Sequence, residues 1–149
     1  MNKKMSQAIE LALKKEDASY KHYLKLYSSA TDSNLKKLFN NLAIQELRHQ
    51  ALLKEYQKTE DFFEAKTNVS GRFEQNFSIT RELNPSSEVT DMVAELKNAL
   101  EKEKKSEKLY RELVNETKNE DLKSLFLMLA DEEIRHKKML KDEYDKLIS

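Results

Sequence analysis

Two four-residue stretches, Glu46-Leu47-Arg48-His49 and Glu133-Ile134-Arg135-His136, are nearly identical and lie 87 residues apart. Each places a glutamate and a histidine three residues apart, which puts both side chains on one face of an α-helix. The same offset relates Glu16 to Glu103. The chain therefore supplies Glu, Glu-x-x-His, Glu and Glu-x-x-His in that order, as expected of a carboxylate-bridged two-metal site inside a four-helix bundle.

The repeat extends well beyond these motifs. When residues 8–55 are aligned with residues 95–142 without gaps, 19 of the 48 positions are identical. The identities include Ala12/Ala99, Leu13/Leu100, Ser19/Ser106, Tyr23/Tyr110, Leu26/Leu113, Leu35/Leu122, Leu38/Leu125, Phe39/Phe126, Leu42/Leu129 and Ala43/Ala130. Two helical hairpins related in this way are expected to pack face to face about a pseudo-two-fold axis, with equivalent side chains on opposite sides of one central point.

The composition indicates long helices and few turns, because the 149 residues include one glycine and one proline. The sequence predicts an all-α fold, an antiparallel four-helix bundle in a single domain over residues 1–149. Two hairpins, at about 4–58 and 88–148, are joined by a long crossover at about 59–87. The four amphipathic segments are expected at about 4–30, 33–58, 88–117 and 120–148.

The crossover differs in composition from the helical segments. It contains the only glycine, Gly71, and the only proline, and the cluster Asn84-Pro85-Ser86-Ser87 is a stop-and-cap signal before the third helix. It also carries four phenylalanines: Phe62, Phe63, Phe73 and Phe77. These side chains are expected either to hold the crossover against the bundle or to contact a second subunit.

Charge and cysteine content exclude several classes of function. Lys and Arg together number 27, as do Asp and Glu, so the formal net charge is zero and gives no general attraction to nucleic acid or anionic membrane. The absence of cysteine excludes disulfides, cysteine-ligated zinc and iron–sulfur clusters within this sequence. No signal peptide or transmembrane run is recognisable, so we expect a cytoplasmic protein.

The glutamates and histidines of the motifs interrupt otherwise apolar helix faces. A buried, unpaired carboxylate is costly, so these side chains must be neutralised, paired or metal-bound. We predict six metal ligands: Glu16, Glu46, His49, Glu103, Glu133 and His136. Glu46 and Glu133 would bridge two metals, Glu16 and His49 would complete one position, and Glu103 and His136 the other. Oxygen and imidazole ligands suit iron or manganese, or a mixed pair, better than softer metals.

Tyr23 and Tyr110 lie two helical turns after Glu16 and Glu103 on the same faces. They are candidates for hydrogen bonds to the metal-binding carboxylates or for a redox role. The alternative is that each is simply a core tyrosine with a satisfied hydroxyl.

Taken together, these motifs and the two tyrosines resemble the ferritin-like di-iron superfamily, and within it the rubrerythrin family. The resemblance covers the chain apart from residues 59–87. It implies a di-iron centre that reduces hydrogen peroxide, or dioxygen, as a defence against oxidative stress in anaerobes and microaerophiles. It also implies a homodimer, in some members formed through exchanged helices.

Two departures from the rubrerythrin pattern affect the expected mechanism. No cysteine-ligated rubredoxin domain is present in the sequence, so electrons are expected from an external donor such as a rubredoxin. The position of the seventh ligand of rubrerythrins, a glutamate three residues after Glu103, is Ser106, mirrored by Ser19, and Glu107 lies one position further round the helix. The symmetric six-ligand set is closer to that of bacterioferritin, whose site oxidises ferrous iron.

Three functional hypotheses follow. The first is a di-iron peroxidase or oxidoreductase acting through the six ligands, with Tyr23 and Tyr110 beside them. The second is a ferroxidase or iron-storage protein of the bacterioferritin type. The third is a non-enzymatic helical module with a structural metal. Its metal would be inactive, and the module would tolerate Glu46→Ala.

Overall fold

The computed structural model describes residues 1–73 and 91–149 of the chain. Within these ranges it contains five α-helices and no strand, which confirms the all-α fold. They are α1 (Lys3–Ser29), α2 (Ser33–Thr59), α3 (Phe62–Val69), α4 (Met92–Glu116) and α5 (Glu120–Ile148). The four long helices occupy the predicted segments, while α3 lies in the segment expected to be a crossover.

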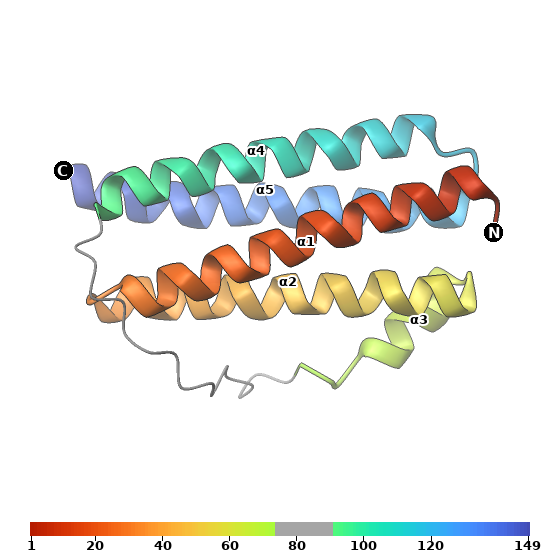
Figure 1. The fold of residues 1–149 in the computed structure, drawn as a ribbon, viewed down its shortest axis with the longest axis horizontal. Coiled ribbons are helices and arrows are strands. Elements are labelled where there is room, and N and C mark those ends of the chain that lie inside the picture. The colour runs from red at the N-terminus through yellow and green to blue at the C-terminus, as the bar shows by residue number, and fades with distance from the viewer. Residues whose placement is uncertain (74–90) are drawn as a thin grey trace.

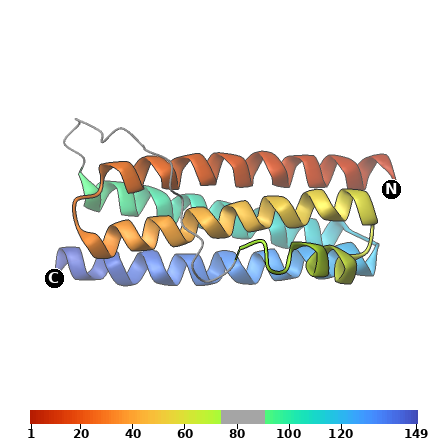
Figure 2. The same cartoon turned by 90° about the horizontal axis from the view of Figure 1, so that it is seen from below.

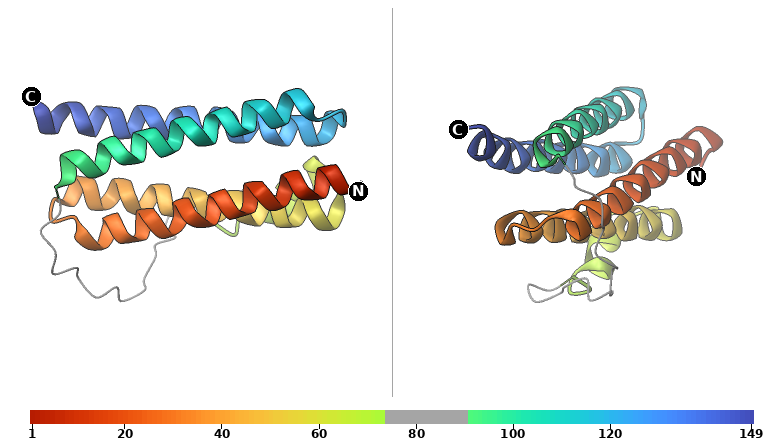
Figure 3. Two further views of the ribbon diagram at one scale, coloured as in Figure 1. Left: turned by 45° about the horizontal axis from the view of Figure 1, so that its top comes forward. Right: turned by 60° about the vertical axis from the view of Figure 1, so that its left-hand side comes forward.

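The long helices form two antiparallel hairpins, α1 with α2 and α4 with α5, that lie against each other along the length of the bundle (Figure 1). Packing is closest within each hairpin, while α1 meets α4 and α2 meets α5 across the interface between hairpins. Figure 3 shows the two hairpins as separate layers, with the carboxyl end of α5 far from the amino end of α1. The expected face-to-face packing of two hairpins is therefore observed.

Side-chain caps define where the helices begin. Asp32 accepts hydrogen bonds from the backbone N–H groups of Asn34 at 2.9 Å and Leu35 at 3.0 Å, which starts α2 immediately after the tight turn from α1. Asp91 caps α4 in the same way through the N–H of Ala94. The helix therefore begins at Met92, later than the predicted start at 88. The stop-and-cap cluster Asn84-Pro85-Ser86-Ser87 lies outside the described residues.

Helix α3 packs against α2 and α5 (Figure 2). The Asp61 side chain caps it by accepting from the N–H of Glu64, and the backbone N–H of Phe62 donates to Asp121 of α5 at 2.7 Å. Phe62 itself is buried, whereas Phe63 is 75% exposed. Phe62 and Phe73 therefore behave as the predicted contacts to the bundle, Phe63 does not, and Phe77 lies outside the described residues.

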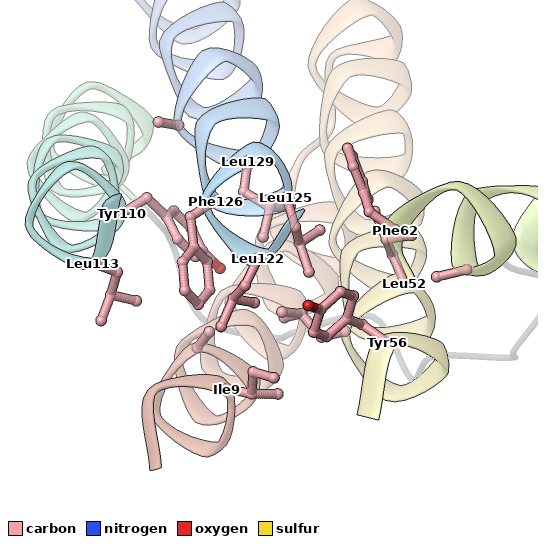
Figure 4. Close-up of a cluster of buried hydrophobic side chains, with 14 of the residues drawn as sticks. Ile9, Leu52, Tyr56, Phe62, Tyr110, Leu113, Leu122, Leu125, Phe126 and Leu129 are labelled. Atoms are coloured by element: carbon pink, nitrogen blue, oxygen red, sulfur yellow. The ribbon is translucent and has the colours of Figure 1, made fainter. Parts of the chain in front are cut away.

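The buried apolar residues of ranges 1–73 and 91–149 form two clusters, one towards each end of the bundle. One of them joins residues of all four long helices and α3, with Tyr56, Phe62, Tyr110 and Phe126 among its largest side chains (Figure 4). The other is built around Tyr23, Phe39, Leu42 and Leu96. Several residues of the first cluster are repeat equivalents of residues in the second, including Tyr110 and Tyr23, and Phe126 and Phe39. Polar side chains occupy the level between the clusters.

None of the helices in the described ranges is both long and apolar enough to span a bilayer.

Candidate metal centre

Four helices each contribute to the polar layer between the two apolar clusters. Glu16 comes from α1, Glu46 and His49 from α2, Glu103 from α4, and Glu133 and His136 from α5. None of these side chains is more than 2% exposed. The helical spacing that placed them on apolar faces has therefore carried all six into the interior of the bundle.

The six side chains form two overlapping groups. Glu16, Glu46, His49 and Glu133 bring one potential ligand atom each within 4.8 Å of one another, and so do Glu46, Glu103, Glu133 and His136. Glu46 and Glu133 belong to both groups, which is the arrangement expected of bridging carboxylates. Glu16 and Glu103 each belong to one group, with His49 and His136 respectively, as the sequence predicts. That these residues bind metal stays a prediction.

The two histidine rings face each other across the centre, with ring centroids 5.8 Å apart and planes inclined by 10°. Nδ1 of His49 lies 3.2 Å from a carboxylate oxygen of Glu16 and 3.6 Å from one of Glu133. Nδ1 of His136 lies 3.2 Å from an oxygen of Glu46. Both imidazoles therefore turn Nδ1 towards the carboxylates.

The tyrosines connect the two hairpins. Tyr23 of α1 donates its hydroxyl hydrogen to Glu103 of α4, and Tyr110 of α4 donates to Glu16 of α1. The two bonds are related by the repeat, and both tyrosine side chains are buried. The predicted position of these residues beside the terminal carboxylates is therefore observed, and any redox role stays a prediction.

The layer contains more acceptor atoms than its donors satisfy. Among the described residues, no hydrogen bond of good geometry reaches Oε1 of Glu46, Oε2 of Glu103, Oε1 of Glu133 or Nδ1 of His136, although all four atoms are buried. Buried polar groups without partners are rare in folded proteins because each carries a desolvation penalty. A pair of divalent cations coordinated by these oxygen and nitrogen atoms would remove that penalty, so the residues present fit a two-metal centre.

Electrostatics within the layer separates the carboxylates into two kinds. Burial and the neighbouring carboxylates raise the pKa of Glu46 and the pKa of Glu133 well above the ordinary value. Burial alone would also raise the pKa of Glu16, but His49 and the hydrogen bond from Tyr110 outweigh it and lower that pKa to about 2. Burial opposes the charge on His49, yet Glu16 and Glu132 raise its pKa to about 10. Without metal, the centre therefore holds protons that cations would displace.

Gln45 and Glu132, which the sequence motifs did not single out, contact the two histidine rings on the side away from the four carboxylates. Nε2 of His49 lies against a carboxylate oxygen of Glu132, and Nε2 of His136 donates to Oε1 of Gln45 at 2.7 Å. Gln45 and Glu132 each immediately precede a motif glutamate, and the 87-residue offset relates one to the other. The repeat could have drawn attention to the pair, but the bonds themselves depend on how the hairpins pack.

The structure also places the residues around the missing seventh ligand. Ser106 is buried on α4, and Glu107 pairs with Lys137 at 2.5 Å and with Arg111 at 2.8 Å. In the described part of the chain, Glu107 belongs to neither of the two groups of potential metal ligands. The Glu107 carboxylate therefore pairs with the side chains of Lys137 and Arg111 and not with the residues of the two groups.

Comparison with known proteins agrees with the fold and the site. The Rubrerythrin family model matches residues 1–57 and 95–148, which is well over half of the chain. The chain is thus an all-α bundle with a buried Glu/His layer, and it belongs to the Rubrerythrin family. No curated protein sequence matches significantly.

Two solved structures show the same fold. A hypothetical protein from Pyrococcus furiosus superimposes with a TM-score of 0.71 and 24% identity, over 97% of this chain and 90% of that one. A two-domain protein from Anabaena variabilis, with DJ-1/ThiJ/PfpI-like and ferritin-like domains, gives a TM-score of 0.73 and 15% identity. That match covers 95% of this chain and 39% of the two-domain protein. At these identities the likeness shows the fold alone.

Proposed function

We propose that this protein is a non-haem di-iron oxidoreductase that reduces hydrogen peroxide, or dioxygen, with electrons from an external donor such as a rubredoxin. The observation that carries the proposal is the pair of overlapping groups that share Glu46 and Glu133. Four carboxylates balance the charge of two divalent cations, and carboxylate with imidazole suits iron or manganese better than softer metals. Membership of the Rubrerythrin family supports iron and an oxidoreductase activity.

The residues of the chain have distinct roles in this proposal. Glu46 and Glu133 would be shared by both metals, while Glu16 and His49 would complete one position and Glu103 and His136 the other. When bound, two ferrous ions would polarise the O–O bond of hydrogen peroxide and would supply the two electrons that, with two protons, convert it to two water molecules. Tyr23 and Tyr110 hold the two terminal carboxylates in place through their hydroxyl groups. The apolar clusters on either side exclude bulk water from the reacting atoms.

A surface pocket lies next to the proposed centre. The pocket has a volume of about 290 Å³ and is lined by Arg48, Leu52, Phe73, Met128 and Glu132, among others. Since Glu132 also contacts the ring of His49, the pocket ends one side chain away from a proposed metal ligand. The pocket is large enough to admit a molecule the size of peroxide.

One observation favours a second candidate, a ferroxidase of the bacterioferritin type. The rubrerythrin-type seventh ligand is replaced by Ser106, and Glu107 is paired with Lys137 and Arg111. The remaining six ligands are symmetric about the centre, and iron would then be the substrate as well as the cofactor.

The homodimer implied by the family resemblance is part of the first proposal and is testable by light scattering.

The two candidates are separated by one stopped-flow series. The metal-free protein is loaded anaerobically with two equivalents of Fe(II) and then mixed with peroxide or with air-level oxygen. Much faster oxidation by peroxide, followed by re-reduction and repeated turnover with an added electron donor, is the result expected of the oxidoreductase. Faster oxidation by oxygen, with iron uptake continuing beyond two ions per chain, would establish the ferroxidase instead.

A matched pair of variants gives the control for this series. Glu46→Ala removes a proposed bridge and is expected to abolish rapid oxidation, whereas Glu101→Ala, on the exposed face of α4 beside Lys104, leaves it unchanged. Bound metal that reacts with neither oxidant, together with full tolerance of Glu46→Ala, would support the non-enzymatic module.

A further inference from the structure

The residues that contact the histidines from outside are equivalent in the repeat but differ in charge. Gln45 of the first hairpin accepts a hydrogen bond from His136 of the second, and Glu132 of the second contacts His49 of the first. The first acceptor is a neutral amide and the second is a carboxylate. At this point the pseudo-symmetry of the centre is broken.

Both contacts fix the orientation of an imidazole. An amide oxygen or a carboxylate oxygen facing Nε2 requires the hydrogen to lie on Nε2. The lone pair of the neutral ring is then on Nδ1, which in both histidines faces the carboxylates of the centre. Gln45 and Glu132 therefore hold both histidines in the form that binds a metal through Nδ1.

The difference in charge acts on the two positions unequally. A hydrogen bond to an ionised acceptor is stronger than one to a neutral amide, and it makes the imidazole a more basic ligand. Glu132 also brings a negative charge to the side of His49 that faces away from the centre, and its side chain is 20% exposed. His136, which belongs to the metal position that contains Glu103, has no equivalent negative charge beside it, because its partner is the neutral Gln45.

We propose that Glu132 is a positioning residue that makes the two metal positions inequivalent, so that the position formed by Glu16 and His49 binds its metal first and more tightly. This inference rests on the proposed two-metal centre. It goes beyond that centre by assigning an order of filling to positions that the six-ligand set alone would leave equal.

Anaerobic titration of the metal-free protein with Co(II) tests the inference without any turnover. Visible absorption and calorimetry report the binding steps, and proton NMR of the one-to-one complex shows whether His49 or His136 carries the first ion. Wild-type protein is expected to bind in two resolved steps, with His49 shifted first. Glu132→Gln retains the size and the hydrogen-bonding capacity of the side chain and is expected to weaken the first step about 10–100-fold, which brings the two steps together.

The exchanged variants complete the design. Gln45→Glu is expected to tighten the second step, and the double variant with both exchanges is expected to reverse the order so that His136 is shifted first. Glu101→Gln, a surface control that keeps the same change of charge, leaves both steps unchanged. Circular dichroism melting of each metal-free variant verifies that the bundle is intact.

The outcomes are distinguishable. Two indistinguishable steps in wild-type protein, or steps that Glu132→Gln does not move, would overturn the inference while leaving the two-metal centre intact. Failure of wild-type protein to bind Co(II) at all would contradict both the inference and the proposed function.

Discussion

Tyr23, in the first hairpin, donates its hydroxyl hydrogen to Glu103, in the second. The bond joins two buried side chains 80 residues apart in the chain, and its repeat equivalent runs from Tyr110 to Glu16. The two hairpins are therefore connected at the level of the proposed metal centre by reciprocal hydrogen bonds as well as by apolar packing. Each tyrosine hydroxyl thus links the two hairpins and contacts a proposed ligand.

Removing either hydroxyl is expected to destabilise the metal-free protein. Tyr23→Phe and Tyr110→Phe each leave a buried carboxylate oxygen without its donor, at a cost of about 1–3 kcal/mol in the free energy of unfolding. Urea unfolding monitored by circular dichroism measures this cost. Tyr144→Phe, in the half-buried last turns of α5, is the control and should change little. Wild-type stability in both site variants would show that the bonds contribute nothing to the fold.

Metal affinity is expected to fall as the pH falls. Burial and neighbouring carboxylates raise the pKa of Glu46 and the pKa of Glu133, so cations must displace protons from these groups. Co(II) titrations at pH 6 and pH 8 should therefore show weaker binding at the lower pH. Calorimetry in buffers of different ionisation enthalpy should show proton release on binding. Affinity that is independent of pH would mean that both carboxylates are already ionised in the metal-free protein.

His49 gives the metal-free protein a stability that depends on pH. Its pKa is raised to about 10 by Glu16 and Glu132, against an ordinary value of 6.5. A raised folded-state pKa stabilises the protein fully below the unfolded-state value, and this contribution is lost as the pH rises from about 6.5 through about 10. Urea unfolding of the metal-free protein over this interval should therefore show declining stability.

A matched pair of histidine variants isolates that contribution. His49→Gln should flatten the decline, whereas His22→Gln should leave it in place, because burial and Lys102 lower the pKa of His22. An equal slope in wild-type protein and His49→Gln would assign the decline to other groups, such as the bridging glutamates.

Adjacent phenylalanines in α3 test how the short helix is held. Phe62 is buried against the bundle and Phe63 is 75% exposed. Phe62→Ala is expected to lower the free energy of unfolding by about 3 kcal/mol, as is usual for loss of a buried aromatic side chain. Phe63→Ala should remain within about 0.5 kcal/mol of wild type. A large loss for Phe63→Ala would instead indicate that its ring is covered in an assembly of subunits.

Much of the fold was predictable because it depends on local patterns. The apolar residues at helical spacing, the near absence of glycine and proline, and the repeat together define the two hairpins. The helix faces predicted for Glu46, His49 and their repeat equivalents hold in the structure because one helical turn fixes them. Helix α3 was not predicted, although Asp61 and Glu64 form an N-terminal capping pattern, because an eight-residue helix gives only a weak periodic signal.

The features that could not be predicted depend on contacts between different helices. Glu132 reads in the sequence as one of many charged helix residues, and only the packing of α5 beside α2 places it against His49. Similarly, the sequence shows only that Glu107 follows the position of the missing seventh ligand, and its pairing with Lys137 is a contact between α4 and α5. Spacing along one helix gives the face of a residue, but its partner on another helix requires the tertiary structure.

Whether the chain holds a two-metal centre is decided by the number of Fe(II) ions that the metal-free protein binds anaerobically. Equilibrium titration of the wild-type chain should reach two ions per chain, and Glu46→Ala and Glu133→Ala should each lower that occupancy because both metals share these carboxylates. Glu101→Ala should retain two. A shared two-metal centre predicts saturation at two ions in wild-type protein and loss of metal in the two bridge variants. Binding of no stoichiometric iron, or full occupancy in both bridge variants, would contradict it.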